Sequence, residues 1–440
     1  MNGQKMKRYL IRADFDPAEI ADPMDYVSKS FVGGNSGNLM YAYGVMNTVK
    51  TTQTELEYTY KWQFSDAEVD GINQRYDAFI IPMADAFRKG FVRQLEGYTE
   101  MIKRLRIPVV IPGIGLRADY EPDFKTGFEF DGAAKAFVGA ALEKTAVLGL
   151  RGEITADYLK HLGFTPERDY TPIGCPSLYT YGDSVRTREL RLPLSKLALN
   201  ANGYYNIGFI QDFIRNTEKK FPECFLIQQM QDEFLDLYLG NALLSYRLKG
   251  GQKTDKYIIS GKSLDKMYRE DRVRFFFDVP SWINYIRSFD LFVGNRFHGA
   301  VAAVLSGTPC VMIPFNARTR EMTEYHHLTS LKPEEIRQDT CVTDYLDGLD
   351  FHLFQKHQSE NLDRYVRFLE KNGLQHVFSE KTGYEMGESP LERELFLKSR
   401  ISAAEYNNVL HDFKSLSFSQ KARRAFISNW KDFKRLIVGK

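Results

Sequence analysis

The stretch DLFVGNRFHGAVAAVLSGTPCVMIP (290–314) restricts the possible folds more than any other part of the sequence. Its apolar run at residues 291–293 ends at a Gly-Asn turn signal, and a helical pattern of small residues follows over residues 299–306. A second apolar run covers residues 310–313. This order predicts two parallel strands joined by a helix in a right-handed crossover.

Short apolar runs alternate with helical patterns along most of the chain. Expected strands lie at residues 9–11, 76–82, 107–115 and 146–150, and the pattern restarts at residues 196–201, 223–229 and 273–278. Such short, almost continuous apolar runs are typical of parallel strands buried on both faces. The sequence therefore predicts an α/β fold class with doubly wound, parallel sheets.

The length of the chain indicates more than one domain. A chain of 440 residues exceeds what one ordinary hydrophobic core holds. Charge and proline interrupt the apolar runs around residues 186–193. We expect an N-terminal Rossmann-like domain at residues 1–190 and a C-terminal Rossmann-like domain at residues 191–345. Residues 346–440 show no clear strand pattern and are expected to form a helical extension.

The last residues of this extension predict a basic amphipathic helix. Apolar side chains recur at Phe426, Trp430, Phe433 and Ile437, and lysines and arginines surround them. Such a stripe either packs on the body of the protein or rests on an anionic membrane surface, and both interpretations stay open.

Composition excludes several classes of protein. The 59 basic residues are offset by 57 acidic ones, which argues against bulk nucleic-acid binding. The four cysteines are widely spaced, so buried free thiols are expected, and no metal or other cofactor is predicted. The start of the chain has no signal-peptide pattern and no apolar run reaches membrane-spanning length. A cytoplasmic protein is expected, and the tail leaves a peripheral position at the inner face of the membrane open.

Arg296 and His298 directly follow a predicted strand and precede a predicted helix. Ligands of parallel α/β sheets bind outside the carboxyl ends of strands, and the start of a helix favours an anion. Arg296 adds a donor fork that suits a carboxylate or phosphate. The alternative is structural: Arg296 forms a salt bridge between domains and His298 caps the helix.

Arg151 follows the predicted strand at residues 146–150 in the same manner. It is either a second anion ligand or the partner of Glu153. Near the start of the chain, the turn GGNSGN contains Asn35, Gly37 and Asn38. Its glycines would let backbone N–H groups approach a ligand closely, although ordinary turn chemistry explains them equally well.

These segments together resemble the polysaccharide pyruvyl transferase family. The R-x-H-G block at residues 296–299, followed by the G-x-P at residues 307–309, carries most of the resemblance. LRGEITADYLKHLG, YDAFIIP, IPVVIPGIG and, weakly, NSGN extend it over roughly residues 30 to 330.

The resemblance implies a glycosyltransferase-B-like arrangement of two Rossmann-like domains around a cleft. It implies transfer of an enolpyruvyl unit from phosphoenolpyruvate to a sugar or oligosaccharide acceptor, free or lipid-linked, as a cyclic ketal. Arg151 and Arg296 would bind the anionic groups of the donor, and His298 would be the general acid. Asn35, Gly37 and Asn38 would belong to a cleft loop.

The sequence departs from the family pattern in two places. The chain reads Pro82, Met83, Ala84, Asp85 where the family commonly has a glycine triplet, and Asn38 stands where an aspartate is usual. Two other functions therefore stay open. One is a glycosyltransferase-B-type enzyme that uses a nucleotide sugar, and the other is a non-catalytic protein of polysaccharide assembly.

Overall fold

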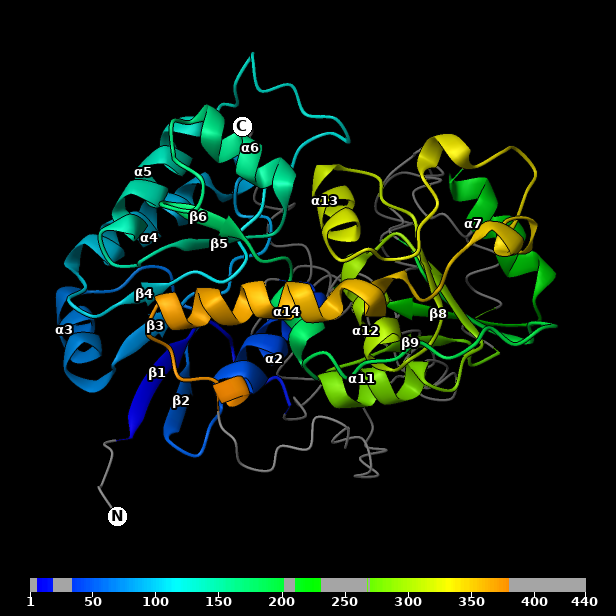
Figure 1. Cartoon of the computed structure of the whole chain (residues 1–440), viewed down its shortest axis with the longest axis horizontal. Coiled ribbons are helices and arrows are strands. Elements are labelled where there is room, and N and C mark those ends of the chain that lie inside the picture. The colour runs from blue at the N-terminus through cyan, green and yellow to red at the C-terminus, as the bar shows by residue number, and fades with distance from the viewer. Residues whose placement is uncertain (1–5, 19–33, 202–209, 231–266, 268–269, 380–440) are drawn as a thin grey trace, which may run out of the picture.

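The computed structural model describes residues 6–18, 34–201, 210–230, 267 and 270–379 (Figure 1). Its first unit contains a parallel sheet with the strand order β2-β1-β3-β4, and beside it a parallel pair, β5 and β6. These strands are β1 (Lys7–Ile11), β2 (Thr54–Tyr58), β3 (Ala78–Ile80), β4 (Val109–Val110), β5 (Leu148–Leu150) and β6 (Tyr170–Pro172). A bridge between Ile114 and Leu150 connects the pair to the segment that follows β4.

Helices connect these strands and cover the sheet. They are α2 (Gly37–Val49), α3 (Asp66–Arg75), α4 (Val92–Arg104), α5 (Asp131–Leu142) and α6 (Glu153–His161). Helix α3 begins at a capping box, in which the Ser65 side chain and Glu68 satisfy each other's backbone N–H groups. Helix α4 buries Leu95, Tyr98 and Ile102 on one side, as its amphipathic spacing predicts.

The second unit is built around one parallel sheet with the strand order β11-β10-β7-β8-β9. Its strands are β7 (Lys196–Asn200), β8 (Glu223–Gln228), β9 (Val273–Phe275), β10 (Leu291–Gly294) and β11 (Cys310–Met312). Its helices are α7 (Ile210–Lys220), α11 (Val279–Ile286), α12 (Phe297–Leu305) and α13 (Ala317–Tyr325). The strand–helix–strand order predicted for residues 290–314 is confirmed, since β10 and β11 pair in parallel around α12.

Helix α14 (Leu353–Lys371) runs across both units in Figure 1. Its Gln358 donates hydrogen bonds to the carbonyls of Leu178 and Gly182, in the segment that connects the units, at 2.7 and 3.0 Å. The short 3-10 helices are η2 (Lys89–Phe91), η3 (Pro176–Tyr179), η4 (Pro333–Glu335), η5 (Val342–Asp344), η6 (Leu346–Gly348) and η7 (Val377–Ser379).

A single cluster of buried apolar side chains extends through both units. It joins Ile11 and Met40 of the first unit to Phe292 of the second and Tyr365 of α14. Helix α2 lies at the centre of this cluster, and eleven of its thirteen residues are buried. A Cβ atom on Gly44 would lie 2.4 Å from the Cα atom of Ser177, so only glycine allows α2 to pack this closely against η3.

The predicted fold class is confirmed: two parallel α/β units face one another, with a helical C-terminal region (Figure 1). The four cysteines are buried and unpaired, as expected. The domain limits remain predictions, and residues 380–440, with the amphipathic tail, lie outside the described residues. Within the part of the chain that the structure describes, no helix is long and apolar enough to cross a membrane.

Candidate active site

Arg151 and His298, two of the predicted site residues, lie directly after the carboxyl ends of strands. Arg151 follows the last residue of β5, and His298 lies in the first turn of α12, just after β10. Gly37 opens α2. Within each sheet the parallel strands present their carboxyl ends at one edge. These two edges lie close together, so Arg151, His298 and Gly37 come to one region of the molecule, around Tyr41.

His298 is almost completely buried, with 1% of its surface exposed. Its Nε2 atom lies 3.8 Å from Sγ of Cys175, and its ring stacks on Tyr41 with the centroids 6.5 Å apart. A Cβ atom on Gly37, in the same helix as Tyr41, would approach Nδ1 of His298 to 2.8 Å. The imidazole is therefore held between α2 and the segment that begins at Cys175.

The predicted cleft loop connects the two units. The side-chain oxygen of Asn35 accepts hydrogen bonds from the Gly37 N–H at 2.9 Å and from Nε2 of Gln229 at 3.0 Å. The Ser36 N–H donates to the carbonyl of Gln229 at 2.8 Å. Asn38 is partly exposed, and its N–H donates to the Asn35 carbonyl. Gly33, the first residue of the turn, lies outside the described residues.

Arg151 is fully buried and keeps unused donor capacity. Its Nε donates to the Gly113 carbonyl at 2.8 Å, and its guanidinium lies 4.3 Å from the centroid of the Tyr41 ring. Nη1 contacts the sulfur of Met322, whereas Nη2 makes no hydrogen bond. In the part of the chain that the structure describes, Arg151 contacts Gly113 and Met322 and not Glu153, whose charged neighbours are Arg364, Asp157 and Glu167. A buried guanidinium with a free N–H group is suited to an anionic ligand.

The charges around His298 disfavour its protonated form. Burial lowers the pKa of His298 well below its usual value, the positive charges of Arg151 and Arg318 lower it further, and Asp85 opposes them. In the protein without ligand the imidazole is therefore neutral at pH 7.

Arg296 is the N-cap residue of α12, and its side chain does not cap the helix. It is 6% exposed and donates from Nε to the carbonyl of Ala201, just beyond β7, at 3.2 Å. Arg296 therefore sits at the carboxyl edge of the second sheet, where its position in the sequence predicts it.

Sequence reasoning missed three charged residues near this site. Arg318 lies in the first turn of α13, Glu321 lies one turn later, and Asp85 follows β3. Arg318 has the same signal as Arg151 and Arg296, an arginine at the start of a helix that follows a strand. Asp85 was visible in the sequence only as a departure from the family pattern.

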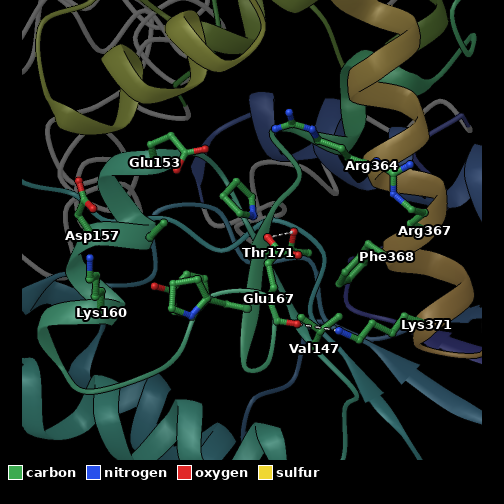
Figure 2. Close-up of a pocket in the computed structure, with 14 residues that line it drawn as sticks. Val147, Glu153, Asp157, Lys160, Glu167, Thr171, Arg364, Arg367, Phe368 and Lys371 are labelled. Carbon is green, nitrogen blue, oxygen red and sulfur yellow. Dashed lines mark hydrogen bonds between the residues drawn. The ribbon is translucent and has the colours of Figure 1, made fainter.

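A cavity of about 520 Å³ lies elsewhere, between α6, β6 and α14 (Figure 2). Figure 2 shows Glu153, Asp157 and Lys160 of α6 on one side and Arg364 and Lys371 of α14 on the other. The predicted site residues do not line it. The candidate site is therefore the cluster of side chains around His298, and not this cavity.

The fold and the cluster define an α/β protein with a buried cationic site between two units. The family model for polysaccharide pyruvyl transferase matches residues 35–316, which is more than half of the chain. The chain therefore belongs to the polysaccharide pyruvyl transferase family. The family marks it as a transferase of polysaccharide biosynthesis, with a pyruvyl donor and a sugar or polysaccharide acceptor.

Three solved structures show a distant likeness to this chain. An uncharacterised protein from Klebsiella pneumoniae is 12% identical, with a TM-score of 0.37, over 72% of this chain and 88% of the other. The UDP-GlcNAc 2-epimerase from Neisseria meningitidis is 10% identical, with a TM-score of 0.40, over 83% and 100%. The heptosyltransferase from E. coli is 10% identical, with a TM-score of 0.28, over 82% and 99%. No curated protein matches the chain. Similarities this low carry no conclusion about function.

Proposed function

We propose that the protein transfers the enolpyruvyl unit of phosphoenolpyruvate to two hydroxyl groups of a sugar in a surface-polysaccharide precursor. The products are a cyclic pyruvate ketal and inorganic phosphate. Family membership supports the pyruvyl donor. The observation that carries the proposal is that His298 of the second unit and Arg151 of the first both lie against the Tyr41 ring, at 6.5 Å between ring centroids and 4.3 Å from guanidinium to centroid, and that the buried Nη2 atom of Arg151 makes no hydrogen bond.

In this proposal Arg151 and Arg296 bind the two anionic groups of the donor. Phosphoenolpyruvate carries a phosphate and a carboxylate, and a guanidinium donates two parallel hydrogen bonds to either group. A bound dianion opposes the positive charges of Arg151 and Arg318, so it raises the pKa of His298 and favours its protonated form.

The protonated imidazole is then the general acid. As the first sugar hydroxyl forms a bond to C2, His298 gives its proton to the methylene carbon, which becomes a methyl group. The hydroxyl proton leaves to a base. The second hydroxyl then forms its bond to C2 as the C2–O bond to phosphate breaks; its proton leaves to a base, and phosphate departs with the bonding electrons.

The test is stabilisation of the purified protein by ligands. A ligand that binds only the folded state at 100 times its Kd adds about 2.7 kcal/mol to the unfolding free energy, which shifts the Tm measurably. Phosphoenolpyruvate is expected to raise the Tm of the wild type and not that of Arg296→Ala. Arg93→Ala, which removes an exposed arginine of α4, is the matched control and should behave as the wild type.

Two results would contradict the proposal. One is a Tm shift with nucleotide sugars and none with phosphoenolpyruvate, which favours a nucleotide-sugar enzyme. The other is a His298→Asn variant that folds, binds phosphoenolpyruvate and still releases phosphate at the wild-type rate when an acceptor is present.

A further inference from the structure

The departure from the family pattern at residues 82–85 introduces a buried carboxylate. Asp85 follows β3 and is 8% exposed. Its Oδ1 atom lies 2.5 Å from Nη1 of Arg88, and its Oδ2 atom lies 3.4 Å from Nη1 of Arg117. Arg117 comes from the segment after β4, so two strand ends of the first unit contribute cations around this carboxylate.

A third cation comes from the second unit. Helix α13 begins against the first unit, where the Ala317 N–H donates to the carbonyls of Ala118 and Asp119 at 3.2 and 3.1 Å. The next residue, Arg318, has a buried Nε atom that makes no hydrogen bond. Although burial raises the pKa of Asp85, Arg318, Arg88 and Arg117 outweigh it, and Arg318 exerts the largest effect among these charges. The pKa of Asp85 therefore lies well below its usual range, and this carboxylate stays ionised.

The group Asp85, Arg88, Arg117 and Arg318, here called the Asp85 cluster, carries three positive charges and one negative charge. It adjoins the candidate site, because the charges of Arg318 and Asp85 act on both His298 and Arg151. Three cations around one buried carboxylate favour a dianion over a neutral ligand, although the Arg88 and Arg117 side chains are 29% and 41% exposed and therefore partly screened by solvent.

We propose that the Asp85 cluster is a phosphate subsite next to Arg151, at which the Asp85 carboxylate competes with the incoming phosphoryl group for Arg318 and Arg88. The ligand is a small molecule whose phosphate contacts both this subsite and Arg151 and whose second anionic group lies at Arg296. The identification of this ligand as phosphoenolpyruvate rests on the proposed function. Phosphate is a product of that reaction, so a competing carboxylate speeds its departure.

Isothermal titration calorimetry of the full chain tests the subsite, with inorganic phosphate and phosphoenolpyruvate as probes. Removing the competing charge in Asp85→Asn should tighten phosphate binding about tenfold, and removing a ligand in Arg318→Gln should weaken it about tenfold. Asp119→Asn is the matched control, since it removes an exposed carboxylate from the segment that carries Arg117, and it should stay within about twofold of the wild type.

The outcomes separate this proposal from the proposed function. If Asp85→Asn and Arg318→Gln bind phosphate as Asp119→Asn does, the subsite is wrong even where phosphoenolpyruvate binds. If phosphate affinity changes as expected but phosphoenolpyruvate binds no better than phosphate, the subsite stands and the donor is wrong. Should Asp85→Asn not fold, Arg318→Gln decides alone, because it leaves Asp85 paired with Arg88 and Arg117.

Discussion

The carboxylate of Glu321, on α13 of the second unit, accepts hydrogen bonds from the backbone N–H and the hydroxyl of Thr155, at the start of α6 in the first unit. The distances are 2.9 and 2.8 Å. Glu321 is 2% exposed, and a Cβ atom on Gly152 or Gly115 would crowd its side chain. One buried carboxyl group thus joins the helix that follows Arg151 to the helix that carries Arg318.

Glu321 predicts a pH-dependent stability. Burial raises the pKa of Glu321 to about 8, against the opposing effects of Thr155 and of Arg151 and Arg318. An unfolded glutamate ionises near pH 4.3, so between about pH 4.3 and 8 the folded chain retains a proton that the unfolded chain loses. The contribution of this group to the unfolding free energy is complete below about pH 4.3 and decreases, by at most about 1.4 kcal/mol per pH unit, until pH 8.

Glu321→Gln keeps an acceptor for Thr155 and removes the ionisation. We expect this variant to lose less stability than the wild type between pH 5 and pH 8, as measured by urea denaturation at both values. Glu324→Gln, on an exposed position of the same helix, is the control. Equal pH trends in the two variants would show that Glu321 titrates normally.

Gly37→Ala tests the close approach of α2 to the imidazole. The added methyl group would lie 2.8 Å from Nδ1 of His298 and 3.0 Å from Oδ1 of Asn35, so one of these groups must shift. A displacement of a catalytic group by about 1 Å costs up to 100-fold in rate, and we expect phosphate release with an acceptor to fall by about that factor. In Gly139→Ala the methyl group meets nothing within 4 Å on an exposed face of α5, and turnover should not change.

Donor binding should be accompanied by proton uptake. The pKa of His298 is held well below its usual value by burial and by Arg151 and Arg318, and a bound dianion counteracts the two arginines. Titration of phosphoenolpyruvate at pH 7 in buffers of different ionisation enthalpy measures the protons bound. We expect a net uptake in the wild type, absent from His298→Asn, and a donor affinity that decreases as pH rises. A wild type that takes up no more protons than His298→Asn contradicts the acid role.

Gln358→Ala probes how α14 is attached to the body. Its side-chain amide makes two hydrogen bonds to buried carbonyls of the connecting segment, and the loss of both leaves Leu178 and Gly182 without these donors. We expect the unfolding free energy to fall by about 2 kcal/mol. Ser359→Ala changes the neighbouring exposed residue and should alter it by less than about 0.5 kcal/mol. Equal stability of both variants would mean that the two hydrogen bonds of Gln358 contribute nothing to the attachment of α14.

Much of the architecture could be predicted because its strands are buried on both faces. β3, β5 and β10 appear in the sequence as short apolar runs, and each was located to within a few residues. The edge strand β2 was missed, since its sequence TELEY alternates polar and apolar residues and its side chains are partly exposed. β6 was missed because it has only three residues and ends in proline.

The candidate site could be predicted only where one segment carried the whole signal. Arg151, Arg296 and His298 each directly follow a predicted strand, so their positions were readable from local sequence. Asp85 and Arg318 are far apart in the chain, and their electrostatic interaction depends on how α13 packs against the segment that carries Ala118. A local sequence pattern does not show how the two units pack against each other, and this packing determines which charged side chains lie close together.

The burial of α2 limits how the two halves of the protein can diverge. Helix α4 faces solvent on one side and can accept polar exchanges there, whereas α2 is enclosed on almost every side. A change of side-chain volume in α2 would disturb the packing of the sheets of both units and the position of His298. We therefore expect α2 to accept mainly substitutions that keep the side-chain volume. Substitutions in one unit that change the packing around α2 would require a compensating substitution in the other unit.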